Sequence, residues 1–534
     1  MTSSLQTTGR IGQGVRPGES QRQSPHTTLI DILDDDSLLH LFYLYRPAIF
    51  DGDESDDTRS MGGKGWDRER WWIKLAQVCQ RWRKLILGST SYLGLCLVCT
   101  YGTPVADMLA HSPPLPLIID YFDDRNRDIA AEDEDGIILA LEKRDRVRRV
   151  RLEAPVRQLQ KLIIAVDEEY PVLEYLVMLP STVRGSKALI LPDTFQAPHL
   201  CHLALRGFTL PMESRFLTTA AGLVTLCLFM GHPSAYFQPN TLLQWISFMP
   251  QLETLFLSVT HPGRDVETQL MHTPIVTHVT LPNLRLLEFR GVSAYMEAVV
   301  CQITTPCLQK LVIRFPGQIT FSTPRLLQLM NTTENLRFDS AKFVFSWDNV
   351  YLEVYPPEET EMYSLSVLIY CLHLDWQASS MAQIFDSSSQ IFSTVQHLTL
   401  KREAHSLSYE EYNMVDRSEW HKLFRSFSNV KTLRVDDGLV KGLSRSLRQD
   451  DGELPLDLLP DLQELAYSGS GDTDGAFASF IDSRQNAGRP VTLVCPSPRS
   501  LTPLSRSSSP RFFELSPVFP SPAGSSVSGS DLVT

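Results

Sequence analysis

Three short motifs contain side chains that could do chemistry, and each lacks a group that its chemistry requires. Residues 131–142 space acidic side chains as a calcium-binding loop does, but Ala131 stands where that loop needs a carboxylate ligand. Acidic residues at the start of a helix, stabilised by the helix dipole, explain this stretch better. Cys96 and Cys99 have no second such pair and belong to an alternating apolar run, which predicts buried thiols rather than a zinc site.

The other candidates for metal binding, phosphate binding or catalysis are weaker. His199, Cys201 and His202 belong to one predicted strand, so their side chains point to different faces of it. Residues 62–65, Gly-Gly-Lys-Gly, lack the Ser or Thr of a phosphate-binding loop, and the chain has no Gly-x-Ser-x-Gly motif. We therefore expect no enzyme activity, no metal and no cofactor. An enzyme whose site forms only in the folded chain is the alternative.

The composition limits the partners that the chain can have. With 534 residues and a net charge of -13, it lacks the excess of Lys and Arg that binding to nucleic acid requires. A basic run at residues 143–151 is interrupted by Val147 and Val150 at core spacing, so we interpret it as a solvated strand, with nuclear import or phosphate binding as alternatives. Nine scattered cysteines, no N-terminal apolar signal segment and no apolar run of about 18 residues favour a cytoplasmic or nuclear protein without a membrane partner.

Two short segments have the apolar spacing of amphipathic helices. In the first, three Asp residues at 34–36 can cap a helix whose apolar face contains Leu38, Leu41, Phe42 and Tyr45. In the second, residues 75–86, the apolar stripe contains Leu75, Val78, Cys79, Trp82, Leu85 and Ile86. The residues off this stripe are polar. Two short helices with a Trp on the apolar face are typical of a partner-docking unit rather than of a catalyst.

Residues 32–42, 78–83 and 91–93, with Val-Cys-Gln-Arg-Trp-Arg in the middle segment, resemble an F-box of the divergent kind common in mushroom-forming fungi. Residues 95–105 and 115–119 are similar to the same group. The chain departs from most F-boxes at Asp34, where they carry Pro, and in an inserted loop at 46–70, which begins acidic and ends Gly-rich. The resemblance implies that residues 29–100 form an F-box-like helical domain, in which residues near 29–95 bind a Skp-type linker protein and, through it, a cullin. The implied contacts are Ile32, Leu33, Leu38, Leu41, Phe42, Val78, Cys79, Trp82 and Leu85.

One apolar pattern recurs from Val147 onward: an anchor, a second apolar residue three positions later, and a third two positions after that. The anchors are Val147, Leu173, Leu200, Leu223, Leu252, Leu284, Leu308, Leu365, Val395, Val430 and Leu462, with a weaker copy at Thr333. Proline precedes several anchors by two residues, where it stops a helix and lets a strand begin. Strands alternating with helices at this period predict an α/β solenoid over residues 146–496, with a parallel sheet and outer helices. The pattern resembles the irregular leucine-rich repeats that often follow an F-box.

The alternation of strand side chains also predicts a binding surface, because residues between the apolar positions must face away from the core. In four repeats, the last of these outward-facing positions is basic. The four residues are Arg206, Arg290, Arg314 and Lys401. Neighbouring outward positions add Glu288, Lys310 and Arg434. In an acidic protein, these residues predict a basic surface suited to an acidic or phosphorylated ligand. The alternative is that charges at strand ends only keep the sheet solvated.

The remaining segments complete the predicted organisation. Residues 1–28 and 497–534 are rich in Ser, Thr, Pro or Gly and predict disorder, and residues 101–145 connect the helical unit to the repeats. The C-terminal tail contains five Ser-Pro or Thr-Pro pairs that a proline-directed kinase could modify. The resemblance implies a substrate-recruiting adaptor of a cullin ubiquitin ligase, with the repeats holding an unknown target protein. The alternative is a repeat scaffold without ligase function.

Overall fold

The computed structural model describes residues 33–46, 70–122, 129–181, 188–210, 214–230, 237–259, 278–357, 362–385, 391–403, 417–447, 458–467 and 475–494. Two compact units divide this chain, and the boundary between them falls after Leu95. The predictions for residues 1–28, for most of the inserted loop at 46–70 and for the tail at 497–534 lie outside the described residues. Among the described helices, none has the length and apolar character needed to cross a membrane.

The first unit, which we call the helical unit, contains α2 (Asp35–Tyr45), α4 (Trp71–Ala76), α5 (Gln80–Gly88) and α6 (Thr90–Leu93). The predicted cap of α2 is confirmed, because the Asp34 carboxylate accepts a hydrogen bond from the backbone N–H of Ser37 at 2.7 Å. Gly94 ends α6 at φ 60, in the left-handed region that glycine enters without a Cβ clash.

The prediction of one helix over residues 75–86 is wrong, because the chain breaks between α4 and α5. Cys79 is extended, at φ -155 and ψ 170, and its Sγ accepts a hydrogen bond from the N–H of Trp82 at 3.5 Å. Cys79 is therefore the N-cap of α5 rather than a member of a continuous apolar stripe. The break leaves Val78 60% exposed, while Ile86 is fully buried.

The second unit, which we call the sheet unit, is built on a sheet of 16 strands. In spatial order they are β1 (Leu97–Cys99), β2 (Leu117–Tyr121), β3 (Val147–Ala154), β4 (Tyr175–Pro180), β6 (His202–Arg206), β8 (Thr225–Met230), β9 (Thr254–Val259), β11 (Leu286–Arg290), β13 (Lys310–Pro316), β16 (Leu365–Tyr370), β15 (Asn349–Tyr355), β14 (Ser340–Phe345), β17 (His397–Arg402), β18 (Thr432–Val435), β19 (Glu464–Tyr467) and β20 (Thr492–Val494). Two short parallel pairs are separate from this sheet: β5 (Leu189–Ile190) with β7 (Phe208–Thr209), and β10 (Val279–Thr280) with β12 (Ile303–Thr304).

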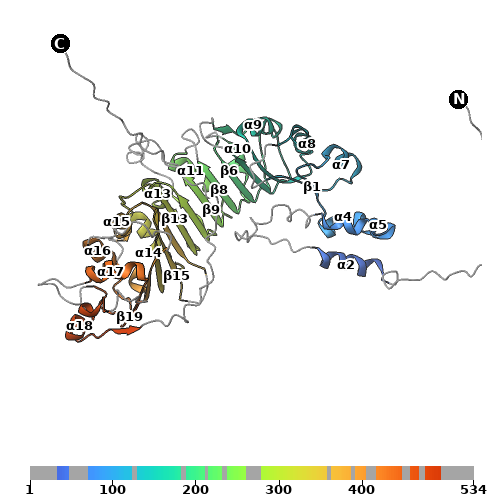
Figure 1. Ribbon diagram of the computed structural model, residues 1–534. Coiled ribbons are helices and arrows are strands. Elements are labelled where there is room, and N and C mark those ends of the chain that lie inside the picture. The colour runs from blue at the N-terminus through green and yellow to red at the C-terminus, as the bar shows by residue number, and fades with distance from the viewer. Residues whose placement is uncertain are drawn as a thin grey trace, which may run out of the picture. The chain divides into compact units, whose positions relative to one another are not determined.

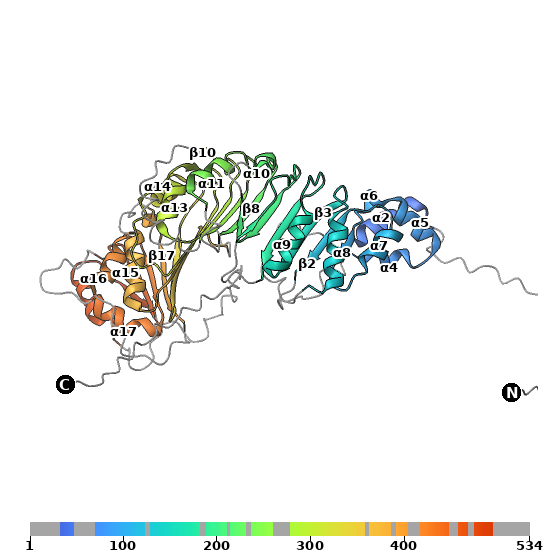
Figure 2. The ribbon, with the colours of Figure 1, turned by 90° about the horizontal axis from the view of Figure 1, so that it is seen from above.

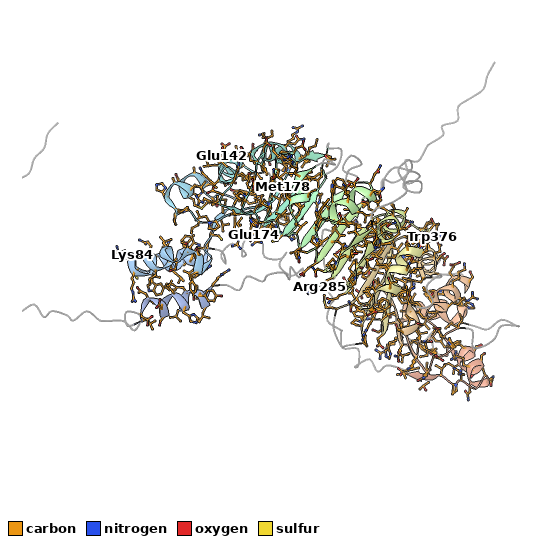
Figure 3. All side chains as sticks on the ribbon, turned by 180° about the vertical axis from the view of Figure 1, so that it is seen from behind. Lys84, Glu142, Glu174, Met178, Arg285 and Trp376 are labelled. Atoms are coloured by element: carbon orange, nitrogen blue, oxygen red, sulfur yellow. The ribbon has the colours of Figure 1, made fainter. Side chains whose placement is uncertain are left out.

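Helices cover one face of the large sheet (Figures 1 and 2). They are α7 (Val105–His111), α8 (Ala131–Leu141), α9 (Val156–Ala165), α10 (Arg215–Thr219), α11 (Pro239–Ile246), α13 (Ser293–Val300), α14 (Pro324–Thr332), α15 (Leu374–Phe385), the short η3 (Phe392–Thr394), α16 (Arg417–Arg425), α17 (Asp437–Ser446) and α18 (Ala478–Asn486). Figure 3 labels Trp376 of α15 on this helical layer. A long parallel sheet with outer helices is the leucine-rich-repeat solenoid that the sequence predicts.

The repeat pattern forms the core between the sheet and the helices. In the copy that begins at Leu252, the three apolar side chains of Leu252, Leu255 and Leu257 are at most 1% exposed. Neighbouring copies align in register, so that Leu255 pairs with Leu287 on β11 and with Leu226 on β8. Each repeat can bury its apolar face only against its neighbours, so the stack shares one continuous core.

Two predicted copies are placed wrongly, because the chain reverses direction there. Leu365 pairs with Leu311, so it holds the second place of its copy and not the anchor. The copy assigned to Thr333 begins instead at Phe338, since Phe343 pairs with the third-place Leu400. The cause is β15, which runs antiparallel between β14 and β16 and interrupts an otherwise parallel sheet.

The sheet also begins before the predicted repeat region. Strands β1 and β2, with α7 and α8, come from residues 97–141, most of which the sequence assigned to a connecting segment at 101–145. β1 has three residues, and all five residues of β2 are buried. Neither strand shows the apolar spacing of the later repeats, so the sequence pattern first appears at Val147.

Candidate binding surfaces

The helical unit has a small interior to which all four of its helices contribute, with Trp71 and Trp72 of α4 and Leu93 of α6 buried beside residues of α2 and α5. Leu38 and Phe42 are 1% and 3% exposed, and the Phe42 ring packs edge-on against Trp82, with 4.8 Å between ring centroids. Arg81 ties the two helices together, since its guanidinium donates to Asp35 at 2.7 Å and to the carbonyl oxygen of Leu33 at 2.6 Å. The first role of Phe42 and Trp82 is therefore to stabilise the helical unit itself, rather than to contact a partner.

Beside this interior, α2 exposes apolar side chains. Leu41, Leu44 and Tyr45 are 48%, 65% and 63% exposed and stand at i, i+3 and i+4, so they share one helix face. We call these three residues the exposed stripe.

The nine predicted contacts with a linker protein separate into three groups in the structure. Leu38 and Phe42 are interior, Leu41, Val78 and Cys79 are exposed, and Leu33, Trp82 and Leu85 are partly buried. Ile32 lies outside the described residues. The sequence prediction missed Leu44, although the run Leu-Phe-Tyr-Leu-Tyr at 41–45 has more apolar side chains than one helix face can bury.

The sheet unit offers a second surface, the face of the sheet opposite the helices, which we call the open face. Strand register places Arg206, Phe229, Ser258, Arg290 and Arg314 in one row across five strands. Lys401 belongs to the same row, four strands beyond Arg314, after Leu368, Tyr351 and Val344. The predicted basic positions thus share a row, but apolar and aromatic residues interrupt it.

Arg290, Lys310 and Arg314 are the densest basic group of the open face, and we call them the basic cluster. Arg314 forms an ion pair with Glu288 at 3.3 Å, and Glu288 is 8% exposed. Burial raises the pKa of Glu288, while the three cations of the cluster oppose that shift. The Lys310 ammonium lies 4.3 Å from the centroid of the Tyr363 ring, and burial lowers the pKa of Lys310.

A second ionic group lies next to it on β14 and β15. Glu353 accepts hydrogen bonds from the Lys342 ammonium and from the Tyr355 hydroxyl, each at 2.8 Å. Burial raises the pKa of Tyr355 and of Tyr351, and the nearby Glu353 carboxylate adds to both shifts. The sequence prediction missed this group, because these strands were assigned to the wrong repeat positions.

The open face becomes apolar toward β4 and β6. Val177, Leu179 and Ala204 are buried there and pack against partly buried aromatic residues that include Tyr175 and Phe229. The ring of His202 stacks on Tyr175, with centroids 4.3 Å apart. This part of the face is therefore more suited to apolar than to ionic contact.

Arg206 does not present its charge to solvent as the sequence prediction required. It is 4% exposed, and its guanidinium lies 5.4 Å from the centroid of the Phe229 ring. Burial lowers the pKa of Arg206. Of the predicted target-binding residues, Lys401 and Arg434 are exposed, Arg290, Lys310 and Arg314 are partly buried, and Glu288 is buried.

The motifs with possible chemistry have structural roles where the structure describes them. Residues 131–141 form α8, whose first turn is acidic, and Asp133 accepts a hydrogen bond from the N–H of Gly102 at 3.0 Å. Cys99 is buried in β1, and Cys96 is partly buried beside it. In the described ranges, no group of three or more His, Cys, Asp or Glu side chains is placed to hold a metal ion.

Comparison with known proteins yields only weak likenesses. No protein-family model and no curated protein matches the chain. Among solved structures, the Rad7–Elc1 complex of yeast is similar at 11% identity, with 82% of this chain and 88% of that chain covered and a TM-score of 0.27. The leucine-rich-repeat protein LegL7 of Legionella pneumophila is similar at 11% identity, covering 74% of this chain and 99% of that chain, with a TM-score of 0.25. Likenesses at this level carry no argument about function.

Proposed function

We propose that this chain is a substrate-recognition adaptor of a Skp–cullin–F-box ubiquitin ligase. In this proposal, the helical unit binds a Skp-type linker protein, and the open face of the sheet unit binds the target protein. The observation that carries the proposal is the exposed stripe, because it places apolar side chains on a small helical unit whose sequence resembles an F-box. Fully burying an exposed Leu side chain contributes about 1.5–3 kcal/mol, and Leu41 and Leu44, which are 48% and 65% exposed, would each contribute about half to two thirds of that to a contact.

The adaptor itself forms and breaks no covalent bond. It holds a target lysine near a ubiquitin-conjugating enzyme, and the rate gain comes from the raised effective concentration of the reacting groups. Two surfaces on separate units fit this role, since one can hold the ligase while the other holds the target.

The test is co-purification of the full chain with a Skp-type linker protein and a cullin. We expect Leu41→Asp combined with Leu44→Asp to abolish recovery of both partners, because the carboxylates cannot enter an apolar contact. Ile164→Asp is the matched control, since Ile164 is 75% exposed on α9 of the sheet unit. Equal recovery by both variants would contradict the proposal. Trp82→Ala is less specific, because Trp82 also packs on Phe42.

A second candidate function is a repeat scaffold that binds partners without a ligase. The mixed open face favours it, because ionic and apolar parts of that face can bind a protein whether or not the helical unit docks on a linker. In that case, the full chain would still bind its target but would not recover a cullin.

A further inference from the structure

The basic cluster places like charges side by side. Arg290 and Arg314 are paired in register on adjacent parallel strands, and such strands lie about 4.8 Å apart. Lys310 stands on the same face of β13 as Arg314. Paired like charges in a sheet are destabilising by themselves, and Glu288 offsets only one of the three cations, so the cluster favours a further anion.

The charges of the surrounding strands support an anionic ligand. Within the strands from β11 to β18, the open face has six cationic side chains and two carboxylates, and Glu403, which directly follows β17, adds a third carboxylate close to Tyr351. The cations are Arg290, Lys310, Arg314, Lys342, Lys401 and Arg434, and the carboxylates within the strands are Glu288 and Glu353. This excess of positive charge stands in a chain whose net charge is -13. The region is therefore a local basic surface on an acidic protein.

The two carboxylates within the strands are already engaged, which leaves Arg290 available. Glu288 pairs with Arg314 at 3.3 Å, and Glu353 pairs with Lys342 at 2.8 Å. The Arg290 side chain is partly exposed and has neither a hydrogen bond nor an ion pair to any residue in the described part of the chain. A guanidinium presents several N–H donors and matches a phosphate group well.

We propose that the basic cluster binds the phosphorylated C-terminal tail of this same chain. Residues 495–534 lie outside the described ranges, and their sequence has Ser497, Thr502, Ser509, Ser516 and Ser521, each followed by Pro. The unmodified tail has three Arg against one Glu and one Asp, so it has no excess of negative charge. Each phosphate would add a charge of about -1.5 to -2, and modification would therefore create the ligand.

The reach of the tail selects which sites can take part. β20, which ends at Val494, lies seven strand spacings from β13 and eight from β11, at most about 34 and 38 Å along the sheet. An extended chain covers at most about 3.6 Å per residue, so Ser509 can lie up to about 54 Å from Val494. Ser497 and Thr502 can lie at most about 11 and 29 Å away. Ser509, Ser516 and Ser521 therefore reach the basic cluster with chain to spare, whereas Ser497 falls well short of it.

A phosphorylated tail at this place would cover the open face and compete with a target. This consequence rests on the proposed function, whereas binding of the tail does not. Modification by a proline-directed kinase would then reduce target binding while leaving the exposed stripe of the helical unit unaffected.

The first experiment uses the dephosphorylated full chain and a fluorescent peptide of residues 505–520 with phosphate on Ser509 and Ser516. Fluorescence anisotropy should show at least about tenfold tighter binding than for the unphosphorylated peptide, and Arg290→Gln should remove at least about tenfold of that affinity. Arg285→Gln is the matched control, because Arg285, labelled in Figure 3, directly precedes the same strand, β11. Its guanidinium lies 4.0 Å from the Glu253 carboxylate and outside the basic cluster. Thermal melting should confirm that both variants are folded. Equal affinity for the two peptides, or no effect of Arg290→Gln, would overturn the site.

The second experiment asks whether the tail is the occupant. The full chain phosphorylated by a proline-directed kinase should bind the phosphopeptide at least about tenfold more weakly, since its own tail competes at a high effective concentration. Replacing Ser509, Ser516 and Ser521 by Ala should restore binding, and replacing Ser497 alone by Ala should not. Full binding by the phosphorylated chain would overturn the tail as ligand. Neither experiment includes the linker protein, so its outcome is independent of the co-purification test.

Discussion

The helical unit and the sheet unit differ in how completely they bury their apolar side chains. The sheet unit hides its repeat side chains, such as Leu255 and Leu287, almost completely and presents ionic groups on part of its open face. The helical unit has a small interior and leaves Leu44 and Tyr45 more than half exposed. A partner that binds exposed apolar side chains does so by burying them, and salt changes the affinity of such a contact little. A partner that binds an ionic surface should bind more weakly as the salt concentration rises. The chain thus combines two kinds of contact on separate units.

The largest effect on stability should come from the core of the sheet unit. Leu287→Ala removes a side chain that is 1% exposed between strands β9 and β13, and should cost about 2–5 kcal/mol of unfolding free energy. Urea unfolding followed by circular dichroism measures this loss. A loss of unfolding free energy near zero would contradict the contrast between the two units, because the repeat core would then not stabilise the sheet unit.

A change in the exposed stripe should separate binding from stability. Leu44→Ala should leave the unfolding free energy within about 0.5 kcal/mol of the original chain, because Leu44 is 65% exposed. Binding to a linker protein should weaken by about 1–2 kcal/mol, two thirds of the burial energy of one fully exposed Leu side chain. Surface plasmon resonance beside urea unfolding measures both values. If stability fell as much as binding, Leu44 would have to be counted with the interior.

The apolar part of the open face should make the sheet unit sensitive to acid. Burial lowers the pKa of His202 to about 4, and Arg149 and Arg151 add to the shift. The unfolded chain, with its His near 6.5, binds more protons between these two pH values, so stability should fall as the pH decreases through that window. The expected loss is about 1–3 kcal/mol, and His202→Phe should remove it. Unfolding free energies at pH 7 and near pH 5 for both chains provide the measurement, and parallel losses would argue against His202 as the source.

The smallest effect should come from the ion pair on the surface of the helical unit. Arg81 pairs with Asp35 at 2.7 Å while both side chains remain more than one third exposed. Water and salt screen such pairs, so Arg81→Ala should reduce the stability of the helical unit by about 0.5–1 kcal/mol. Hydrogen exchange of the amides in α2 and α5 measures this local change. A loss as large as that of Leu287→Ala would show that surface ions, not apolar packing, hold this unit.

Much of the sheet could be predicted from the sequence, because the apolar residues that recur along the chain are the residues that the structure buries in the core. The copies from Leu173 to Leu308 have the predicted buried positions, and their strands align in register. The reversal at β15 could not be predicted, because an antiparallel strand has the same alternation as a parallel one. The break before α5 was missed because Cys79 acts as an N-cap, a role usually taken by Ser, Thr, Asp or Asn.

The candidate surfaces could be predicted only in part, since they depend on neighbours that lie far apart in the chain. Alternation along each strand placed Arg290 and Arg314 in one row, as the register shows. The burial of Arg206 depends on Phe229 of the next strand, and the pairing of Lys342 with Glu353 depends on the β14–β15 hairpin. A pattern read along one strand does not contain these cross-strand contacts.

The most direct test of the adaptor role is calorimetric titration of the full chain with a purified Skp-type linker protein. The account predicts micromolar or tighter binding that changes less than about threefold between low and high salt, because the contact is apolar. Leu41→Asp with Leu44→Asp should weaken it by at least about a hundredfold, while Ile164→Asp should leave it unchanged. Absence of binding by the unaltered chain, or equal binding by both variants, would contradict the account.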